Sequence, residues 1–269
     1  MADPALALKG VYKLFPLAGR GQGDAFVALA GLDLEVARGE FLTLVGPSGC
    51  GKSTVLNLAA GFTAATRGAV ECGGRPVAGL NRAVGYITQD DNLLPWRTLL
   101  ENVELALEFH RVPREERRSR CAALLAQVGL QGFEEHYPHQ LSGGMRKRAA
   151  IVRTLAYDPA ILLMDEPFGP LDAQTRLILQ DQLLRLWEGS GRTIVFVTHD
   201  IVEAITLSDC VAIFAAAPGR IKAMLEVPIP RPRDVFHIHG HEAFAPLYDK
   251  IWTELRDELA GGLGQPGAR

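Results

Sequence analysis

A glycine-rich segment, GPSGCGKST at residues 46–54, has the composition and spacing of a phosphate-binding loop. Glycines leave backbone N–H groups free to turn toward phosphate oxygens, and a helix that starts at the loop directs its positive end at the same anion. Lys52 adds a point charge for the β- and γ-phosphates, and the Ser53 hydroxyl is a hard oxygen ligand for Mg²⁺. We therefore expect a nucleotide to be held with Mg²⁺ by Gly46, Ser48, Gly49, Cys50, Gly51, Lys52, Ser53 and Thr54.

Two adjacent carboxylates end a strongly apolar segment, ILLMDEP at residues 161–167. A strand that delivers an acid to the phosphate side of a sheet suits Mg²⁺ binding, and we assign that role to Asp165. Side chains alternate along a strand, so Glu166 points elsewhere, where it could hold the attacking water as a general base. The alternative is an ordinary polar strand end, which the nearby phosphate loop makes less favourable.

Two further polar side chains follow short apolar strands. Gln89 comes after YIT and can reach Mg²⁺ or water without adding charge, while His199 in FVTHD can donate a hydrogen bond to a γ-phosphate. Each is weak evidence alone, because a histidine at a strand end is more often structural. Together with Asp165 they predict that three strand ends bring polar groups to one sheet edge, where ligands of open α/β sheets bind.

A second glycine-rich helix start, LSGGMRKR, occupies residues 141–148. Ser142 is a favourable N-cap, and Gly143 and Gly144 leave the first helical turn uncovered. Exposed N–H groups at a helix start form an anion site, and the basic residues that follow add positive charge. We expect this start to bind the γ-phosphate of a nucleotide held by a second copy of the chain, although an ordinary capped helix remains the simpler alternative.

The elements expected around these residues indicate an α/β fold. Short apolar runs at 41–46, 160–166 and 193–200 are typical of buried parallel strands, each followed by a helical pattern. Residues 98–156 are mostly helical in pattern and more charged. Residues 5–9 and 26–36 are typical of edge strands. We therefore predict a P-loop core with a mainly parallel sheet, an antiparallel β subdomain and an inserted helical subdomain.

Bulk properties exclude several classes of protein. The net charge of −3 gives no basic field for nucleic acid, so we expect no nucleic-acid partner. The four cysteines lack metal or redox spacing and are expected to be reduced thiols. The N-terminus lacks the features of a signal peptide, and no segment approaches 18 uninterrupted apolar residues, so any membrane role is expected to run through a partner.

The motifs together resemble the ATP-binding subunits of ABC transporters. GPSGCGKST matches the family's Walker A, ILLMDEP its Walker B, LSGGM its signature, TQD its Q-loop, GPLD its D-loop and VTHD its switch histidine. All six occur in the family's order and span roughly residues 5 to 225. The resemblance implies an ATP- and Mg²⁺-dependent ATPase in which Phe15 stacks on adenine and Asp172 communicates across a dimer.

The resemblance also implies partners. ATP closes a dimer of this chain with itself or with a related ATPase subunit, hydrolysis reopens it, and the motion passes to a transmembrane permease through a groove near Gln89, with residues 92–96 as the candidate contact. MDEPFGPLDAQTR and LLPWRTLLENV resemble the nitrate, sulfonate and taurine importer branch. That branch implies uptake of a small anionic solute, bicarbonate included, with an extracytoplasmic solute-binding protein and a place on the cytoplasmic face of the inner membrane.

Two departures from that branch are visible, and other functions stay open. Pro170 stands in the D-loop where a small residue is usual, and Lys147 stands in the signature helix where Gln is common. The motor could instead serve an exporter of lipids or lipoproteins. It could also be a soluble ABC ATPase uncoupled from transport, or a regulatory binder that senses ATP without turnover.

The expected domain organisation has an ABC ATPase domain over 1–230, with the helical subdomain at roughly 90–157, and a tail over 231–269. Apolar residues recur at helical spacing through 242–259, which predicts an amphipathic helix packed on its own domain, with docking to a partner as the minor alternative. In a strand, His237, His239 and His241 would share one face, which makes a metal site conceivable although a fourth ligand is not evident. Residues 111–120 are expected to form a solvated helix face.

Overall fold

The computed structural model describes residues 3–17 and 25–262, with the backbone alone at 257 and 259–262. A six-stranded sheet in the order β10-β9-β3-β8-β7-β6 forms its centre, and every neighbouring pair in it is parallel except β9 with β10. Its strands are β3 (Phe41–Val45), β6 (Val84–Ile87), β7 (Ile161–Asp165), β8 (Thr193–Val197), β9 (Cys210–Phe214) and β10 (Ile221–Glu226). The predicted mainly parallel sheet is confirmed.

A second, antiparallel sheet has the order β2-β1-β4-β5. It comprises β1 (Leu6–Pro16), β2 (Ala25–Val36), β4 (Arg67–Cys72) and β5 (Arg75–Pro76). The expectation that residues 5–9 form an edge strand is wrong, because β1 pairs with β2 on one side and with β4 on the other. The alternating pattern of β1 reflects one buried and one exposed face of a central strand, which an edge strand shares.

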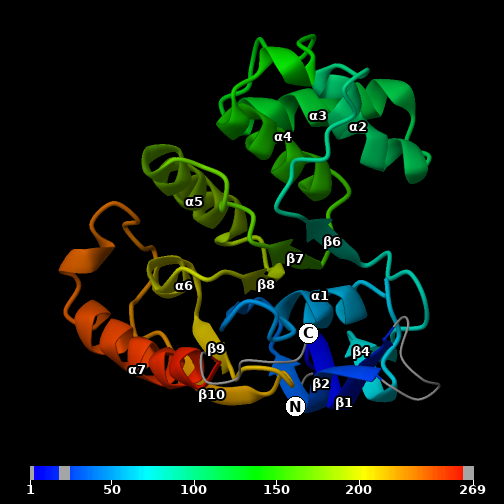
Figure 1. Ribbon diagram of the computed structural model, residues 1–269. Helices are drawn as coiled ribbons and strands as arrows, with labels where there is room; N and C mark the ends of the chain where they lie inside the picture. Colours follow the sequence, from blue (N-terminus) through cyan, green and yellow to red (C-terminus); the bar gives the residue numbers. More distant parts are fainter. Residues whose placement is uncertain (1–2, 18–24, 263–269) are drawn as a thin grey trace.

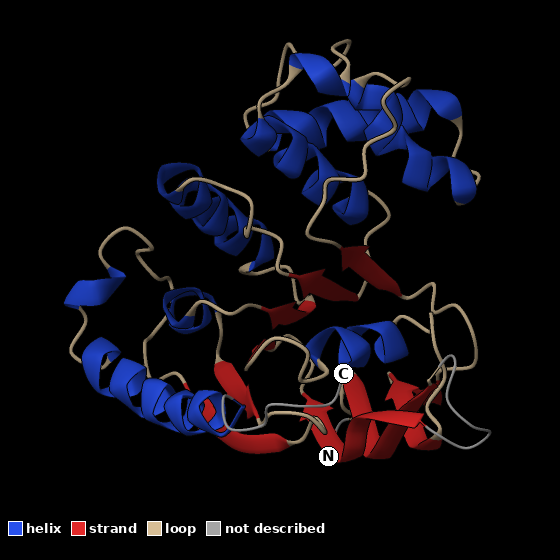
Figure 2. Cartoon of the chain, viewed as in Figure 1, coloured by secondary structure: helices blue, strands red, loops and turns tan. Residues whose placement is uncertain are grey.

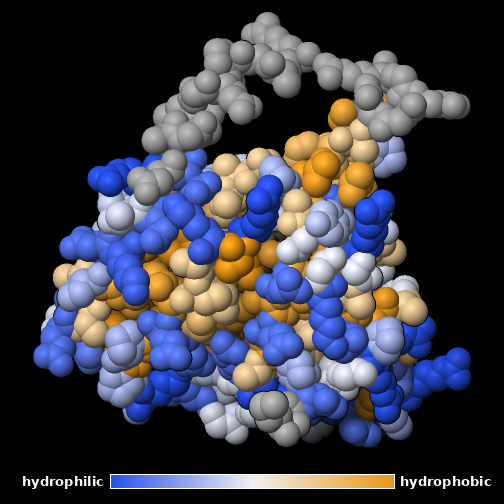
Figure 3. All heavy atoms as spheres, turned by 90° about the horizontal axis from the view of Figure 1, so that it is seen from below, coloured by the Kyte–Doolittle hydropathy of each residue, from blue (hydrophilic) through white to orange (hydrophobic). Residues whose placement is uncertain are grey.

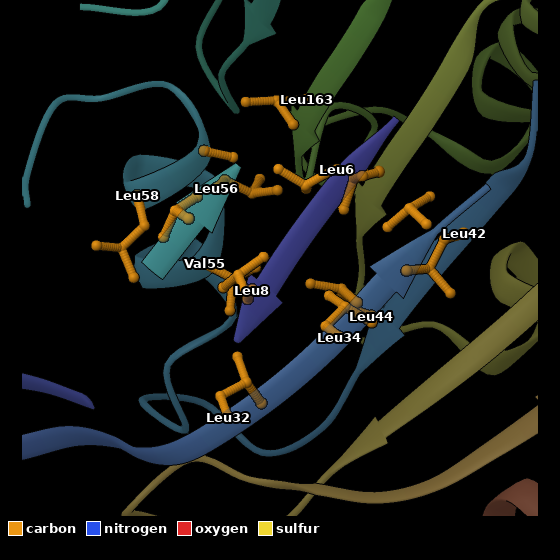
Figure 4. Packing of buried hydrophobic residues seen from close by; sticks show 14 of the residues in the cluster. Leu6, Leu8, Leu32, Leu34, Leu42, Leu44, Val55, Leu56, Leu58 and Leu163 are labelled. Carbon is orange, nitrogen blue, oxygen red and sulfur yellow. The ribbon is translucent and has the colours of Figure 1, made fainter. Parts of the chain in front are cut away.

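Helix α1 (Lys52–Ala59) lies between the two sheets in Figure 1. Val55, Leu56 and Leu58 on α1 are buried and pack in one cluster with leucines from both sheets. Figure 4 shows this cluster, with Leu6 and Leu8 of the antiparallel sheet and Leu163 of β7 around the helix. Because this helix is fixed on two sides, the phosphate loop that precedes it is held in a rigid setting.

Three helices occupy the chain between β6 and β7 and stand above the sheet in Figures 1 and 2: α2 (Leu99–Phe109), α3 (Arg114–Gln127) and α4 (Gly143–Leu155). They have a core of their own, which the buried leucines of α2 and α3 share with α4. Thr98 and Glu101 form a reciprocal capping box that starts α2. A 3₁₀ turn (Pro138–Gln140) precedes α4, and α3 is largely exposed, as expected of residues 111–120.

Helices α5 (Ala173–Trp187), α6 (Ile201–Leu207) and α7 (Phe244–Gly262) cover the remaining faces of the central sheet. The tail crosses from β10 to α7, whose Phe244, Leu247, Ile251 and Leu255 pack against α6 and β9. This is the expected amphipathic helix packed on its own chain. The side chain of Leu259 lies outside the described residues.

Arg233 fixes the tail to α6. Its guanidinium donates hydrogen bonds to the carbonyls of Ile205, Thr206 and Ser208 at the end of α6, at 3.0, 3.2 and 2.6 Å. Its Nε donates to the carbonyl of Ile229 at 3.1 Å. Burial lowers the pKa of Arg233 to about 10, so the side chain stays charged at neutral pH.

The histidine segment is not a strand. Residues 238–240 form a 3₁₀ turn (Ile238–Gly240), so the strand that would place His237, His239 and His241 on one face is not formed. His237 Nδ1 lies 2.7 Å from Asp234, and the ring of His239 packs edge-on against Phe244. Within the described residues, no group of three or more His, Cys, Asp or Glu side chains could hold a metal ion.

In the described part of the chain no helix has the length and apolar character needed to cross a bilayer. The face seen from below in Figure 3 is mostly hydrophilic, with hydrophobic residues gathered toward its central part.

All four cysteines are free thiols, and Cys50 and Cys121 are buried.

Candidate functional site

Three neighbouring parallel strands end at the site. β6, β7 and β8 lie side by side in the sheet, and Gln89, Asp165 and His199 come at or just after their carboxyl ends. The strand order confirms the expectation that the three strand ends lie at one edge of the sheet.

The phosphate loop joins β3 to α1. Gly51 is the N-cap of α1 at φ 100°, a conformation that favours glycine, and a Cβ there would lie 2.8 Å from Leu29 and 2.9 Å from the Ala28 carbonyl. Strand β2 therefore closes over the loop, and only glycine permits this close approach. The first N–H groups of α1 point into the loop without a side-chain cap, as an anion site requires.

Lys52 is buried, and its Nζ donates to the carbonyls of Gly46 (2.7 Å) and Pro47 (2.8 Å). The ammonium is thus held inside the loop by backbone oxygens, in the position from which it can turn to a phosphate. A cavity of about 230 Å³ opens beside it. Its lining comprises Phe15, Phe26, Ala28, Ser48, Gly49, Gly51, Lys52, Ser53, Thr54 and Glu166. Gly46 and Cys50 lie in the loop but outside this lining.

Phe15 and Phe26 form an aromatic pair at the mouth of this cavity. They are register partners in the antiparallel ladder of β1 and β2, and they are 39% and 44% exposed. Adjacent exposed rings beside a phosphate loop suit the stacking of a planar base. The family resemblance implied Phe15, whereas Phe26 and Ala28 were missed, because the register of β1 with β2 cannot be read from either segment alone.

Ser53 and Asp165 bring hard oxygen ligands together. The Ser53 hydroxyl donates to Asp165 Oδ1 at 3.0 Å, and Tyr86 lies 3.4 Å from the other carboxylate oxygen. Burial raises the pKa of Asp165, and the hydrogen bond from Ser53 opposes the shift. A hydroxyl and a carboxylate beside a phosphate loop fit Mg²⁺, which keeps several waters and needs few protein ligands.

Glu166 and His199 are in direct contact. His199 Nδ1 lies 3.1 Å from Glu166 Oε2, and Glu166 also lines the phosphate cavity. Glu166 has φ 45°, so the strand ends sharply at Asp165 and the two adjacent carboxylates diverge. The chain thus separates one carboxylate beside Ser53 from a second beside His199.

Gln89 is exposed and lies on the segment that leads from β6 into the helices. Its amide approaches Gly169, where a Cβ would lie 3.3 Å from Gln89 Nε2. Gly169 follows Glu166 by three residues, so Gln89 reaches the same end of the site.

Lys147 ties the signature helix to this segment. It is 3% exposed, and its Nζ donates to the carbonyls of Thr88 (2.6 Å) and Gln89 (2.8 Å). Burial lowers the pKa of Lys147 to about 8, while the charges of Asp91 and Asp90 oppose the shift. The departure from Gln at this position therefore places a cation directly under the Gln89 backbone.

We expect Lys147→Gln to remove a pH dependence of stability. The pKa of Lys147 is about 8 in the folded chain against an ordinary 10.5, so between these values the unfolded chain keeps a proton that the folded chain has lost. The free energy of unfolding from this group therefore rises with pH across that window and is constant below it.

Urea unfolding of both proteins at several pH values checks this expectation. We expect the difference in the free energy of unfolding, wild type minus Lys147→Gln, to increase by about 1 kcal/mol between pH 8 and 9. Other groups cancel in this difference. Parallel stability profiles would contradict the shifted pKa of Lys147.

The second glycine-rich segment forms the start of α4, where Ser142 and Gly143 are exposed. Ser142 is the N-cap of α4, and its hydroxyl accepts a hydrogen bond from the Met145 N–H at 3.3 Å. Gly143 is exposed, and an added Cβ would meet its neighbours only at 3.9 Å. At Gly144 a Cβ would lie 2.6 Å from the Thr175 methyl group, so this glycine also serves packing against α5.

Asp172 caps α5. Its Oδ1 accepts a hydrogen bond from the Thr175 N–H at 2.9 Å, and this bond lowers the pKa of Asp172. Within the chain its side chain therefore fixes the helix that contacts Gly144. Asp172 is exposed, which leaves it accessible to a second chain.

Comparison with known proteins extends this picture. Residues 29–169 match the family model described as ABC transporter. The chain is 45% identical to an uncharacterized ABC transporter ATP-binding protein of Methanocaldococcus jannaschii, over 96% of this chain and 94% of that protein. It is 44% identical to the taurine import ATP-binding protein TauB of Yersinia pestis, over 88% and 92% of the two chains.

A third relative is the nitrate import ATP-binding protein NrtC of Synechococcus elongatus, at 46% identity over 97% of this chain but only 38% of that protein. Among solved structures, the fold is similar to a dimeric post-hydrolysis state of an ATP-binding cassette bound to ADP and Pi. The TM-score is 0.72 at 34% identity, with 84% of this chain and all of that chain covered.

Proposed function

Because the chain belongs to the ABC transporter ATP-binding proteins, we propose that it is the ATP-hydrolysing motor subunit of an importer for a small anionic solute. The observation that carries the proposal is a single cavity lined by Lys52, Ser53 and Glu166. Asp165 accepts a hydrogen bond from Ser53, and His199 is in contact with Glu166. The chain is an ABC ATPase. What we propose beyond that is the direction of transport and the chemical class of the solute.

Nucleotide binding is assigned to the cavity beside the phosphate loop. The base stacks on Phe15 and Phe26, and the phosphates lie over the loop from Gly46 to Thr54. The Lys52 ammonium exchanges its carbonyl partners for phosphate oxygens. Ser53, Asp165 and Gln89 would hold Mg²⁺, which would supply positive charge to neutralise the nucleotide phosphates.

Hydrolysis is assigned to Glu166, His199 and Gln89. Glu166 accepts a proton from the attacking water, and Gln89 orients that water. The contact of His199 Nδ1 with Glu166 fixes the histidine ring, which leaves Nε2 to face the γ-phosphate. The separation of Glu166 from Asp165 supports this assignment. It leaves Glu166 free to act as the base, while Asp165 lies beside Ser53 at the expected metal site.

A second chain completes the site. Ser142, Gly143 and Gly144 of one copy receive the γ-phosphate held by the other, in a two-fold arrangement that covers two nucleotides. The open start of α4 supports this role, and so does the similarity to a dimeric cassette. Asp172, at the start of the neighbouring α5, is assigned to communication across the same interface.

Gly143→Asp is expected to abolish ATP-dependent dimerisation without loss of fold stability. A carboxylate at the first turn favours the helix dipole, but it repels a phosphate from the other chain. Light scattering with and without ATP in a Glu166→Gln background checks the dimer, and thermal unfolding checks the fold.

Gly240→Asp is the matched control, since a Cβ there also meets open space. It should dimerise as the parent does. Gly144→Ala should instead lower stability by about 1–2 kcal/mol, because its methyl group meets Thr175. Dimerisation of Gly143→Asp at the parental ATP concentration would contradict the assignment.

Import of a small anion is supported by the relatives named for nitrate and taurine, which match nearly all of this chain. A separate permease would carry the solute, delivered by an extracytoplasmic binding protein, and this chain would work from the cytoplasmic face of the inner membrane.

We propose that the permease docks in an apolar groove between α1, β6 and α2. Phe62, Leu80 and Phe109 line it and are 60%, 65% and 80% exposed, and its volume is about 510 Å³. Exposed aromatic rings in a concave site are typical of a docking surface for an amphipathic helix. Trp96, within the expected contact segment 92–96, is 70% exposed, whereas Leu93 is buried.

Pull-down of the tagged chain from detergent-solubilised membranes, with mass spectrometry, tests the proposal. We expect a multi-span permease without an ATPase domain of its own. It should be lost with Phe109→Asp and kept with Phe236→Asp, which alters an exposed ring in the tail. Recovery of soluble partners or nucleic acid alone would overturn the transport assignment, and an exporter-type membrane protein would overturn its direction.

A further inference from the structure

Tyr86 belongs to two sites at once. Its ring lines the apolar groove, and its centroid lies 5.3 Å from that of Phe62 at an interplanar angle of 39°. Phe62 follows α1 and is 60% exposed, so an occupant of the groove meets this pair of rings.

The other end of Tyr86 reaches the nucleotide site. Its hydroxyl oxygen lies 3.4 Å from Asp165 Oδ2, while Ser53 donates to Asp165 Oδ1 at 3.0 Å. Tyr86 pairs with Leu163 on the neighbouring strand, and Asp165 is two residues further on the same face. The carboxylate is thus held between a residue of the phosphate loop and a residue of the groove.

The hydroxyl of Tyr86 has a second acceptor. Asn57 Oδ1, on α1, lies 3.2 Å away, and a single hydrogen cannot serve it and Asp165 equally. Both distances are at the long end for O–H donors, where the strength of the bond changes steeply with position. A small displacement of the ring therefore decides whether the hydroxyl supports the Asp165 carboxylate.

We propose that Tyr86 is a positioning residue that couples the groove to Asp165, so that contact of a permease helix with Phe62 and Tyr86 changes the affinity for nucleotide with Mg²⁺. This inference rests on the proposed function. Since coupling between two sites is reciprocal, nucleotide with Mg²⁺ also changes the position of the ring in the groove.

The test uses the whole chain without a permease and measures binding rather than turnover. The affinity for ATP is measured by competition with a fluorescent nucleotide, once with Mg²⁺ and once with EDTA. Tyr86→Phe keeps the ring and removes the hydroxyl. Phe62→Ala removes the ring contact, and Phe109→Ala alters the same groove from α2 as the control.

We expect the gain in affinity from Mg²⁺ to fall at least about threefold in Tyr86→Phe and in Phe62→Ala, with the affinity in EDTA unchanged. Phe109→Ala should match wild type, and the double variant Tyr86→Phe/Phe62→Ala should lose no more than Tyr86→Phe alone.

An unchanged gain in Tyr86→Phe, or equal behaviour of Phe62→Ala and Phe109→Ala, would overturn the coupling. Failure of the proposed function would look different, because the pull-down of wild type would then recover no importer permease, whatever effect Mg²⁺ has on the affinity for ATP. Thermal unfolding of each variant confirms that the chain is folded, which the exposure of Phe62 and Phe109 favours.

Discussion

Glu166→Gln is expected to lower the rate of ATP hydrolysis by about 100-fold or more while ATP still binds. Glutamine has the same length and can still reach His199 Nδ1, which lies 3.1 Å from the carboxylate in wild type. It cannot accept a proton from water at neutral pH. The loop, Lys52 and Ser53 are untouched, so the nucleotide affinity should be maintained.

Single-turnover hydrolysis measured beside equilibrium ATP binding separates the two effects. Glu188→Gln is a suitable control, because Glu188 lies at the end of α5 and outside the lining of the nucleotide cavity. Near-normal turnover in Glu166→Gln would remove Glu166 from the base role. A parallel loss of binding would instead indicate that the carboxylate supports the loop.

Arg233→Met should have the largest effect on stability, a loss of about 3 kcal/mol or more. The side chain is 1% exposed, and it serves the last carbonyls of α6 together with the carbonyl of Ile229. Methionine fills a similar volume but leaves these buried acceptors without a donor. Because Asp200, the N-cap of α6, directly follows His199, a loosened α6 should also reduce turnover.

Urea unfolding at neutral pH measures the loss. Arg220→Met removes an exposed arginine and should stay within about 0.5 kcal/mol of wild type. Arg233→Lys keeps the charge but cannot span both sets of carbonyls, so an intermediate loss is expected. A change below about 1 kcal/mol in Arg233→Met would show that water replaces the guanidinium.

Much of this architecture can be predicted from local sequence. The apolar runs before Asp165 and His199 are continuous because both faces of their strands are covered, and such runs are readable without partners. The phosphate loop is equally local, since its glycines and Lys52 act within one turn of chain and helix.

What sequence could not predict depends on register and on distant burial. Phe26 becomes a partner of Phe15 only through the pairing of β1 with β2. Tyr86 meets Asp165 only because β6 and β7 are neighbours. The conformation of the histidine segment stayed open for a related reason, since alternation over five residues does not distinguish a strand from a 3₁₀ turn.

The left-handed backbone of Glu166 has a consequence for how this chain is selected. A non-glycine residue at φ 45° costs the fold about 1–2 kcal/mol, which glycine would largely recover. Selection for stability alone would therefore replace glutamate with glycine at this position. In a protein that only senses ATP, this replacement would carry no functional cost. A glutamate placed here at a cost to folding is expected where turnover of ATP, and not only its binding, determines fitness.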